Sequence, residues 1–434
     1  MKKMLALFLA LIMVVAMVPA AFAEDTVKIT VFHYMVEGQK AAAMEEIEKM
    51  FVAAHPETKI EFVNLAYSQG TDYWPQLETA IAAGDNPELI MGNPGLYDTL
   101  INEGYIMDLT GNELIKSLGL TDGDMGDVSY QGKWYAYPID FKSWGVFYNV
   151  KMFEDLGIAV PTTKTELLAA AQKLADNGIT PWAQWYADGA SVDIEMRPIV
   201  WTEALANGDN DMFEKLMSGE KKIAEYPYFA KGLELWAERM GTGWAAPNAT
   251  SNKQTDANEM FVSGQAGMLY QGTWNIGSIE EVMPEGFEYG FFLCPTDDSG
   301  ETPVLNVQVD QAFMVNDKAE NKDWAVKFME FWLTDCMGYW SDASFQPCIT
   351  GATTENTPAL LQSLLAAKAS GNTACYGDFT APFSSAFTSA YRKALYAWSV
   401  FCCTGEVTEG VNSVDTCIEY MQSLFDEEIA KNAL

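Results

Sequence analysis

Apolar and polar residues along the first hundred positions change period repeatedly between that of a strand and that of a helix. Residues 27–32 have the alternation of a half-buried strand, and residues 39–56 place apolar side chains at helical spacing before a proline. Residues 59–64 and 88–92 predict two further strands, each followed by a helical segment. Strands that alternate with helices at intervals of about 30 residues are typical of βαβ units around a parallel sheet.

The pattern changes after residue 130. Residues 130–138 mix Gly and Pro with aromatic side chains and predict a hairpin or an edge strand, whereas residues 141–149 form one long strand-like apolar run. Thr163 and Glu166 form a capping box that predicts the start of a helix. The remaining expected elements are a helical region at 195–240, strands at 289–295 and 306–315, a long helix at 320–334 and a mostly helical C-terminal part.

The first 23 residues have the three parts of a secretion signal. Lys2 and Lys3 precede an apolar stretch, Pro19 follows it, and Ala21–Ala23 forms an A-x-A cleavage pattern. The apolar stretch is shorter than the ~20 residues of a membrane span, so a retained anchor is the less favoured alternative. We therefore expect an exported chain that is cleaved after Ala23. The residue directly after the cut is not a cysteine, so no lipid anchor is expected there.

The composition narrows the classes of partner. The chain of 434 residues carries 60 acidic and 26 basic side chains, a net charge of −34, and 13% aromatic residues. Such a charge repels nucleic acids and anionic lipid surfaces, and the aromatic content is that of a folded protein. The length suffices for two domains, and the absence of a low-complexity linker indicates that crossover strands join them.

The cysteines favour buried thiols over a disulfide framework or a zinc site. Their number is odd and no C-x-x-C spacing occurs, although one or two bridges stay possible in an oxidising compartment. The seven are Cys294, Cys336, Cys348, Cys375, Cys402, Cys403 and Cys417.

Motifs of common enzymes and cofactor sites are missing. The chain has two histidines, no G-x-S-x-G elbow, no H-E-x-x-H and no Walker A loop. The acidic stretch 122–127 (DGDMGD) lacks the spacing of a calcium loop, so we interpret it as a solvated loop. No metal or cofactor is expected. A carboxylate pair for glycoside hydrolysis stays open among 60 acidic residues, since none stands out.

Aromatic and polar residues gather where the predicted strands end, which is where open α/β sheets bind ligands. Sugar rings lie with their C–H faces on aromatic planes, and their hydroxyls pair with bidentate polar groups. The aromatic candidates for such a site are Tyr34, Tyr67, Trp185 and Trp274. The polar candidates are Glu37, Asp72, Asn93, Asp140, Gln184, Arg197, Gln271 and Asp310.

The stretch 264–275 (GQAGMLYQGTWN) admits two interpretations, a phosphate loop or a stacking platform. No phosphate-binding lysine accompanies it, and the chain is too acidic to favour phosphate. We expect Gly264 and Gly267 to let a buried strand pass close to its neighbours and Gly272 to turn the chain. Trp274 is then the ligand-binding residue.

Residues 86–110, 132–183 and 264–275, in this order and spacing, resemble one known family. The chain is similar to the family 1 extracellular solute-binding proteins that serve carbohydrate ABC transporters, and the resemblance spans nearly all of the chain after the signal. A lipoprotein cysteine, common in the family, is missing. Residues 306–311 (NVQVDQ) also replace the small residues that the family usually has there.

The resemblance implies an α/β, two-lobed periplasmic-binding-protein-like fold of type II, with the lobes joined by a multi-strand hinge. Lobe 1 would comprise residues 24–140 and 300–345, and lobe 2 residues 141–299 and 346–434. Asp140 would lie at a hinge. The family places an aromatic residue at the Trp274 position, where it stacks on sugar in the interlobe cleft.

The implied function is that of a monomeric, non-enzymatic solute-binding protein. It would bind a sugar, in particular an oligosaccharide, and deliver it to the membrane permease. Two alternatives stay open. The same fold binds non-sugar solutes such as a polyamine or a glycerophosphodiester, and a secreted carbohydrate-active enzyme is the less favoured possibility.

Overall fold

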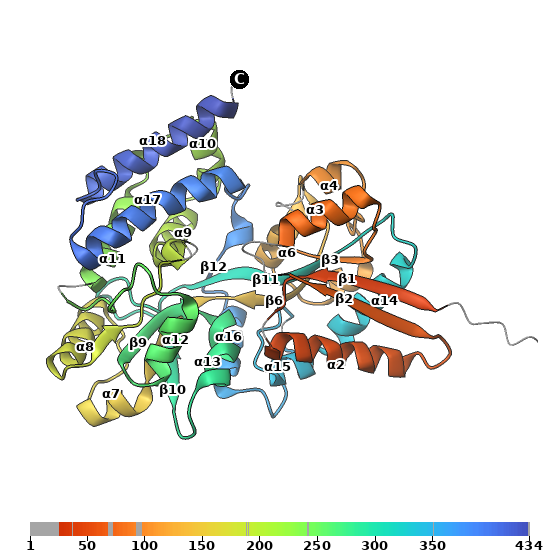
Figure 1. Ribbon diagram of the computed structural model, residues 1–434, viewed down its shortest axis with the longest axis horizontal. Coiled ribbons are helices and arrows are strands. Elements are labelled where there is room, and N and C mark those ends of the chain that lie inside the picture. Colours follow the sequence, from red (N-terminus) through yellow and green to blue (C-terminus); the bar gives the residue numbers. More distant parts are fainter. Residues whose placement is uncertain are drawn as a thin grey trace, which may run out of the picture.

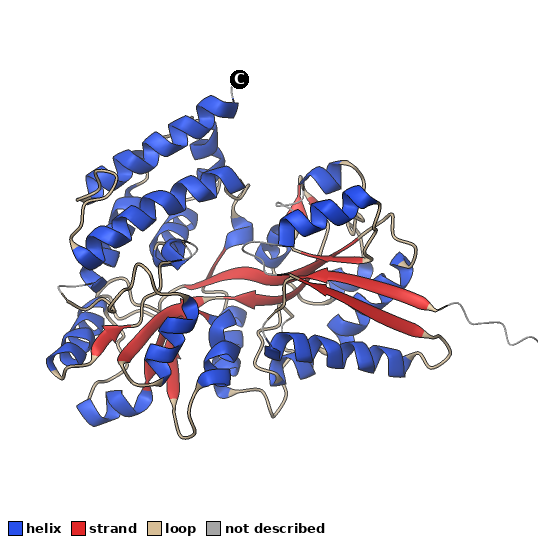
Figure 2. Cartoon of the chain, in the orientation of Figure 1, coloured by secondary structure: helices blue, strands red, loops and turns tan. Residues whose placement is uncertain are grey.

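The computed structural model describes residues 26–36, 38–67, 73–92, 98–187, 189, 191–240, 243–349 and 351–432. Its strands form two main sheets, each with its own layer of helices, and the sheets meet near the middle of the molecule (Figures 1 and 2). The signal segment 1–23 lies outside the described residues. Within the part of the chain described, no helix is both long and apolar enough to cross a membrane.

The first sheet has six strands in the order β12-β11-β3-β1-β2, with β6 also paired to β11. β1 pairs in parallel with both β2 and β3, as the alternating pattern predicts. The strands are β1 (Val27–His33), β2 (Ile60–Ala66), β3 (Leu89–Met91), β6 (Tyr137–Lys142), β11 (Leu305–Val315) and β12 (Thr373–Cys375). The helices near them are α2 (Gly38–Ala54), α3 (Tyr73–Ala83), α4 (Asp98–Asn102), α5 (Glu113–Ser117), α6 (Asp122–Asp127), α14 (Lys322–Asp335), α15 (Met337–Asp342) and α16 (Ala359–Ala369).

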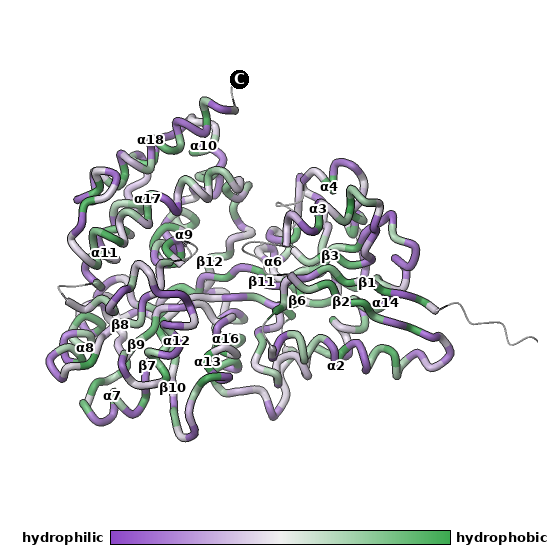
Figure 3. Tube along the Cα trace, viewed as in Figure 1, coloured by the Kyte–Doolittle hydropathy of each residue, from purple (hydrophilic) through white to green (hydrophobic). Residues whose placement is uncertain are grey.

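Both faces of this sheet are covered because β1 is apolar on both sides. Ile29 and Val31 pack in a core with α2 and α14, whereas Phe32 points to the other face and packs with Tyr73 of α3. Figure 3 shows the strands as largely hydrophobic between more polar helices. Buried parallel strands of this kind are the rule in α/β folds.

The second sheet has the order β10-β7-β9-β8. Its strands are β7 (Trp144–Asn149), β8 (Thr180–Trp182), β9 (Ala266–Gly272) and β10 (Tyr289–Phe292). The helices near it are α7 (Val150–Leu156), α8 (Lys164–Asp176), α12 (Gln254–Val262) and α13 (Ile276–Val282). The capping box of Thr163 and Glu166 is present at the start of α8.

A further helical layer completes this second half of the molecule. It comprises η2 (Ser191–Glu195), α9 (Arg197–Ala206), α10 (Met212–Ser218), η3 (Ile223–Glu225), α11 (Pro227–Met240), η5 (Tyr376–Asp378), α17 (Ser385–Thr404) and α18 (Val414–Asn432). The helical character expected for residues 195–240 is confirmed. The hairpin expected near residue 130 is also confirmed, with β4 (Ser129–Tyr130) paired to β5 (Lys133–Trp134).

The single long strand expected at residues 141–149 is wrong, because the run divides between the two sheets at Ser143. β6 pairs with β11 on one side, and β7 pairs with β9 on the other. The Ser143 amide donates to Thr273 Oγ1 at 3.0 Å, and the Thr273 amide donates to the Ser143 carbonyl at 2.9 Å. These bonds, outside either strand ladder, fix the crossing point.

The solvated loop expected at residues 122–127 is also wrong: the stretch is the short helix α6. Thr121 caps it, and Asp124 is buried in an ion pair with Lys368 at 2.7 Å. Gly126 lies so close to η5 that a Cβ there would stand 1.9 Å from the Gly377 carbonyl oxygen. The glycines thus serve a backbone-to-backbone contact rather than a flexible turn.

All seven cysteines lie within the described residues and are free thiols. Five are buried, as expected, whereas Cys402 and Cys403 are half-buried. Burial raises the pKa of the Cys417 thiol to about 12, so that it is protonated at neutral pH.

Candidate functional site at the junction of the two lobes

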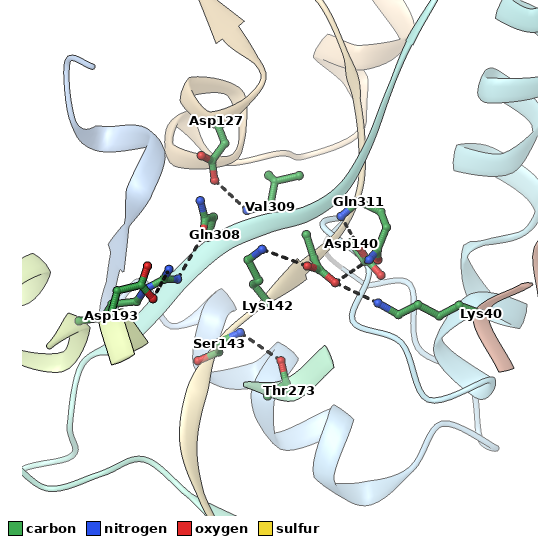
Figure 4. A network of polar contacts seen from close by, with 12 residues as sticks. Lys40, Asp127, Asp140, Lys142, Ser143, Asp193, Thr273, Gln308, Val309 and Gln311 are labelled. Atoms are coloured by element: carbon green, nitrogen blue, oxygen red, sulfur yellow. Dashed lines mark hydrogen bonds and ion pairs between the residues drawn. The ribbon is translucent and has the colours of Figure 1, made fainter. Parts of the chain in front are cut away.

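Strand β11 carries two partly exposed polar side chains at the junction. Gln308 and Asp310 alternate with the buried residues Val307, Val309 and Gln311, and they are the partly exposed positions of this part of the strand. The pairing of β11 with β6 is irregular here, with register shifts on both sides of Gln311. Figure 4 shows the polar contacts that surround them.

Asp310 binds two lysines from different elements. Lys40 of α2 donates to one carboxylate oxygen at 3.0 Å, and Lys142 of β6 donates to the other at 3.1 Å. Burial alone would raise the pKa of Asp310, but the two ammonium groups outweigh burial and hold that pKa well below its usual range. Asp310 is therefore an anion that ties the first helix of lobe 1 to a crossing strand.

Asp193 binds two arginines in a comparable way. Arg197 at the start of α9 donates to Oδ1 at 3.2 Å, and Arg392 of α17 donates to Oδ2 at 2.9 Å from its Nε and 2.8 Å from a terminal nitrogen. Arg197 also donates to Gln308 Oε1 at 3.3 Å. The second lobe is thereby hydrogen-bonded to β11 (Figure 4).

The Arg197 guanidinium lies against two tryptophans. Its carbon atom is 4.2 Å from the ring centre of Trp144 and 4.7 Å from that of Trp201. Trp201 in turn stacks on Tyr376 at 4.7 Å between centroids. Cation–π contacts at such distances fix the plane of the guanidinium and so pre-orient its N–H groups.

Trp274 lies at the end of β9, partly exposed, beside the same group. Its ring is 6.1 Å from that of Trp144 in an edge-on arrangement, and the Lys142 ammonium is 5.9 Å from its centre. The ring occupies the space over Gly272, where a Cβ would stand 1.6 Å from it. The predicted residues Trp274, Arg197 and Asp310 are therefore brought together.

Asp140 lies at the junction but directs its carboxylate into the protein. Oδ1 accepts from the Gln311 amide at 2.8 Å and Oδ2 from Trp340 Nε1 at 3.3 Å. Burial raises the pKa of Asp140 to about 8. Its hydrogen-bonding capacity serves the pairing of β6 with β11.

Three further predicted residues are buried in the second lobe. Gln184 accepts from the Ala246 amide at 2.7 Å, and Gln271 accepts from the Gly272 amide at 2.8 Å. Trp185 packs in a core with Phe261. Gln184 and Trp185 border a small cavity beside the ion pair of Glu195 and Arg239, and that ion pair is itself buried.

The predicted residues of the first lobe are only partly described. Tyr34 contacts the Tyr73 ring at 5.1 Å, and Tyr67 stacks on Phe32 at 5.0 Å, both half-buried. Glu37, Asp72 and Asn93 lie outside the described residues. Whether any of these residues contacts a ligand stays a prediction.

Sequence reasoning missed most of the polar and aromatic residues that surround Arg197 and Asp310. A usable signal was the rarity of arginine, since the chain contains only three and Arg392 is one of them. The missed members are Lys40, Lys142, Trp144, Asp193, Trp201, Gln308, Tyr376 and Arg392. Among the described residues, no cluster of three or more His, Cys, Asp or Glu side chains is arranged to hold a metal ion.

The sequence of this two-lobed chain is similar to those of known proteins. The family described as bacterial extracellular solute-binding protein matches residues 36–335, more than half of the chain. The chain belongs to this family. The multiple sugar-binding protein of Streptococcus mutans is 22% identical over 78% of this chain and 79% of its own. The melibiose/raffinose/stachyose-binding protein of Bacillus subtilis is 23% identical over 70% of each chain.

Solved structures of solute-binding proteins share the fold. A family 1 extracellular solute-binding protein of Bifidobacterium longum subsp. infantis has a TM-score of 0.69 at 17% identity, over 93% of this chain and 99% of that one. A solute-binding protein in complex with raffinose has a TM-score of 0.69 at 18% identity, over 93% and 100%. The two-lobed fold expected from the sequence is thereby confirmed.

Proposed function

We propose that this solute-binding protein is the extracytoplasmic component of an ABC transporter that binds a sugar, in particular an oligosaccharide, between its lobes and delivers it to the permease. The observation that carries the proposal is Trp274, a partly exposed aromatic ring held beside paired charged groups at the lobe junction. The sugar specificities of relatives of this chain support it.

The chemistry of the junction suits a polyhydroxylated ring. The apolar face of a sugar can lie on the Trp274 plane, while Arg197 or Lys142 donates to its hydroxyls. Charge-assisted bonds of this kind are shorter and stronger than neutral ones. A ligand that contacts β11 and β9 at once favours the closed arrangement of the lobes, because only that arrangement offers both sets of contacts.

The described residues of the junction support binding rather than catalysis. Both Asp310 oxygens are engaged by lysines, and both Asp140 oxygens are hydrogen-bonded within the protein. Neither carboxylate is placed as the general acid or nucleophile of a glycosidase. A cationic ligand such as a polyamine is disfavoured by the four cations Lys40, Lys142, Arg197 and Arg392.

We also infer that the chain is exported with cleavage after Ala23, acts as a monomer, and has its lobes at residues 24–140 with 300–345 and 141–299 with 346–434. The division of residues 137–149 at Ser143 supports the first boundary. Mass spectrometry of the secreted protein tests the cleavage site.

A thermal-shift screen tests the function. The purified exported chain is heated with raffinose, xylotriose, chitotriose, spermidine and glycerophosphocholine in turn. A ligand that binds only the folded state raises the unfolding temperature. We expect a sugar to do so and to be recovered unchanged by chromatography. Stabilisation by spermidine or glycerophosphocholine alone, or hydrolysis of the sugar, would contradict the proposal.

A further inference from the structure

Asp193 is shared by two arginines, which leaves a positive charge in excess. One carboxylate accepts from both Arg197 and Arg392, so the three side chains together carry a net charge of +1. The side chains of Asp193 and Arg197 are only 8% and 14% exposed. Water screens charges poorly at such positions, so the excess charge acts on whatever occupies the junction.

Two arginines that share one aspartate are unusual in a chain that is so acidic and so poor in arginine. Only three arginines occur, and the net charge is −34. Arg239 is buried in a pair with Glu195. The other two arginines meet at Asp193, and Arg197 lies against Trp144, whose ring contacts the partly exposed Trp274. A chain that repels anions elsewhere can attract one here.

Arg197 also retains hydrogen-bonding capacity. Its two terminal nitrogens donate to Asp193 and Gln308, which accounts for two of the five N–H groups of a guanidinium within the described residues. The rings of Trp144 and Trp201 hold the group in one plane. The ammonium group of Lys142 is a second cation beside Trp274.

We propose that the bound sugar is acidic, an oligosaccharide with a uronic acid residue whose carboxylate pairs with Arg197 while another part of the sugar lies on Trp274. The proposal rests on the proposed function and names its substrate class. A planar carboxylate matches the fork of a guanidinium.

An acidic sugar and its methyl ester have the same sugar rings and differ in the charge of the carboxyl group. Comparing the two therefore tests the contribution of the carboxylate alone. Titration calorimetry compares trigalacturonic acid and glucuronosyl-xylotriose with their methyl esters, and with glucose 6-phosphate. We expect one acid to bind about tenfold or more tightly than its ester. Added salt should weaken the acid more than the ester.

Failures of the two proposals are distinguishable in this experiment. If neutral sugars or esters bind as well as every acid, or if the phosphate binds best, the acidic substrate is wrong and sugar binding stands. If no member of the neutral or acidic panels binds, the proposed function itself fails.

Three variants test whether the two arginines cause the preference for the acid. Arg197→Gln should abolish most of the preference for acid over ester. Arg392→Gln is the second variant, because Arg392 is half-exposed and its loss lets Asp193 neutralise Arg197 fully. That substitution should lower the affinity for the acid and spare the ester. Lys116→Gln on α5 removes one exposed cation away from the junction and should change neither. Unchanged acid preference in both arginine variants would overturn the assignment.

Discussion

Gly272 leaves the space that the Trp274 ring fills: a Cβ on the glycine would stand 1.6 Å from Cζ3 of the indole. An ordinary carbon contact is more than twice as long, so the two residues form one unit in which the absent side chain orients the ring. The glycine was expected only to turn the chain. Its conformation is extended, with φ −82° and ψ 154°, and the need for glycine is one of space.

Gly272→Ala should therefore displace Trp274. We expect a loss of about 1–3 kcal/mol in the free energy of unfolding, measured with urea, because overpacking forces the ring to move. Sugar affinity should fall as well. Gly338→Ala in α15 is the control, since the added Cβ would meet only a Thr354 methyl at 3.1 Å. If sugar affinity is unchanged in Gly272→Ala, Trp274 does not need its present orientation to bind.

Trp274→Ala should weaken the binding of a sugar by about 0.5–1.5 kcal/mol, the range typical of an aromatic contact. Calorimetry on the variant and on Tyr396→Ala, which removes an exposed ring from α17, separates a local effect from a general one. Equal affinity of Trp274→Ala and the unaltered protein would place the sugar elsewhere.

Asp310→Asn should be costly because it leaves two lysines without their shared carboxylate. Breaking a buried ion pair on one side costs about 3–5 kcal/mol, and partial exposure of Lys142 reduces this, so we expect about 2–3 kcal/mol by urea unfolding. Asp317→Asn disrupts the exposed pair with Lys322 and should cost less than about 1 kcal/mol. Similar losses in both variants would mean that the junction pair is as well hydrated as a surface pair.

Glu48 should make stability depend on pH. Burial raises the pKa of Glu48 from 4.5 to about 7, more than the hydrogen bond from Asn64 lowers it. Between these values the folded state binds more protons than the unfolded state, so the free energy of unfolding falls as pH rises. Glu48→Gln keeps an acceptor for Asn64 and should flatten the decline between about pH 4.5 and 7. The exposed Glu46→Gln should leave the slope in place, and an unaltered slope in Glu48→Gln would exclude this group as its source.

The sequence predicts the elements of lobe 1 well because their periodicity is local. The alternation of residues 27–32 predicts a strand without reference to any other segment, although its burial on both faces appears only in the structure. The division of the apolar run at Ser143 is not local, since it depends on which sheet each half joins. The hydrophobic pattern alone therefore does not predict where the run divides between the sheets.

The candidate site was predictable only in part for the same reason. Trp274 stands out because an aromatic residue follows a glycine-rich strand, and Asp310 because it interrupts an apolar one. Trp144 and Trp201 look like core residues in the sequence, and they acquire a role only when folding brings Arg197 against both rings. The side-chain amide of Gln184 is suited to ligand binding, but it accepts a hydrogen bond from the backbone amide of Ala246 instead.

Strand β11 has a consequence for the order of events in folding. It lies between β3 and β12 in the first sheet, yet it comes from residues 305–315, more than two hundred positions after β3. A chain that emerges N-terminus first has made β1, β2 and β3 long before their neighbouring strand exists. Long-range pairing of this kind is slow to form. In a chain that is exported as proposed above, the first sheet is therefore completed only after residues 305–315 have been made.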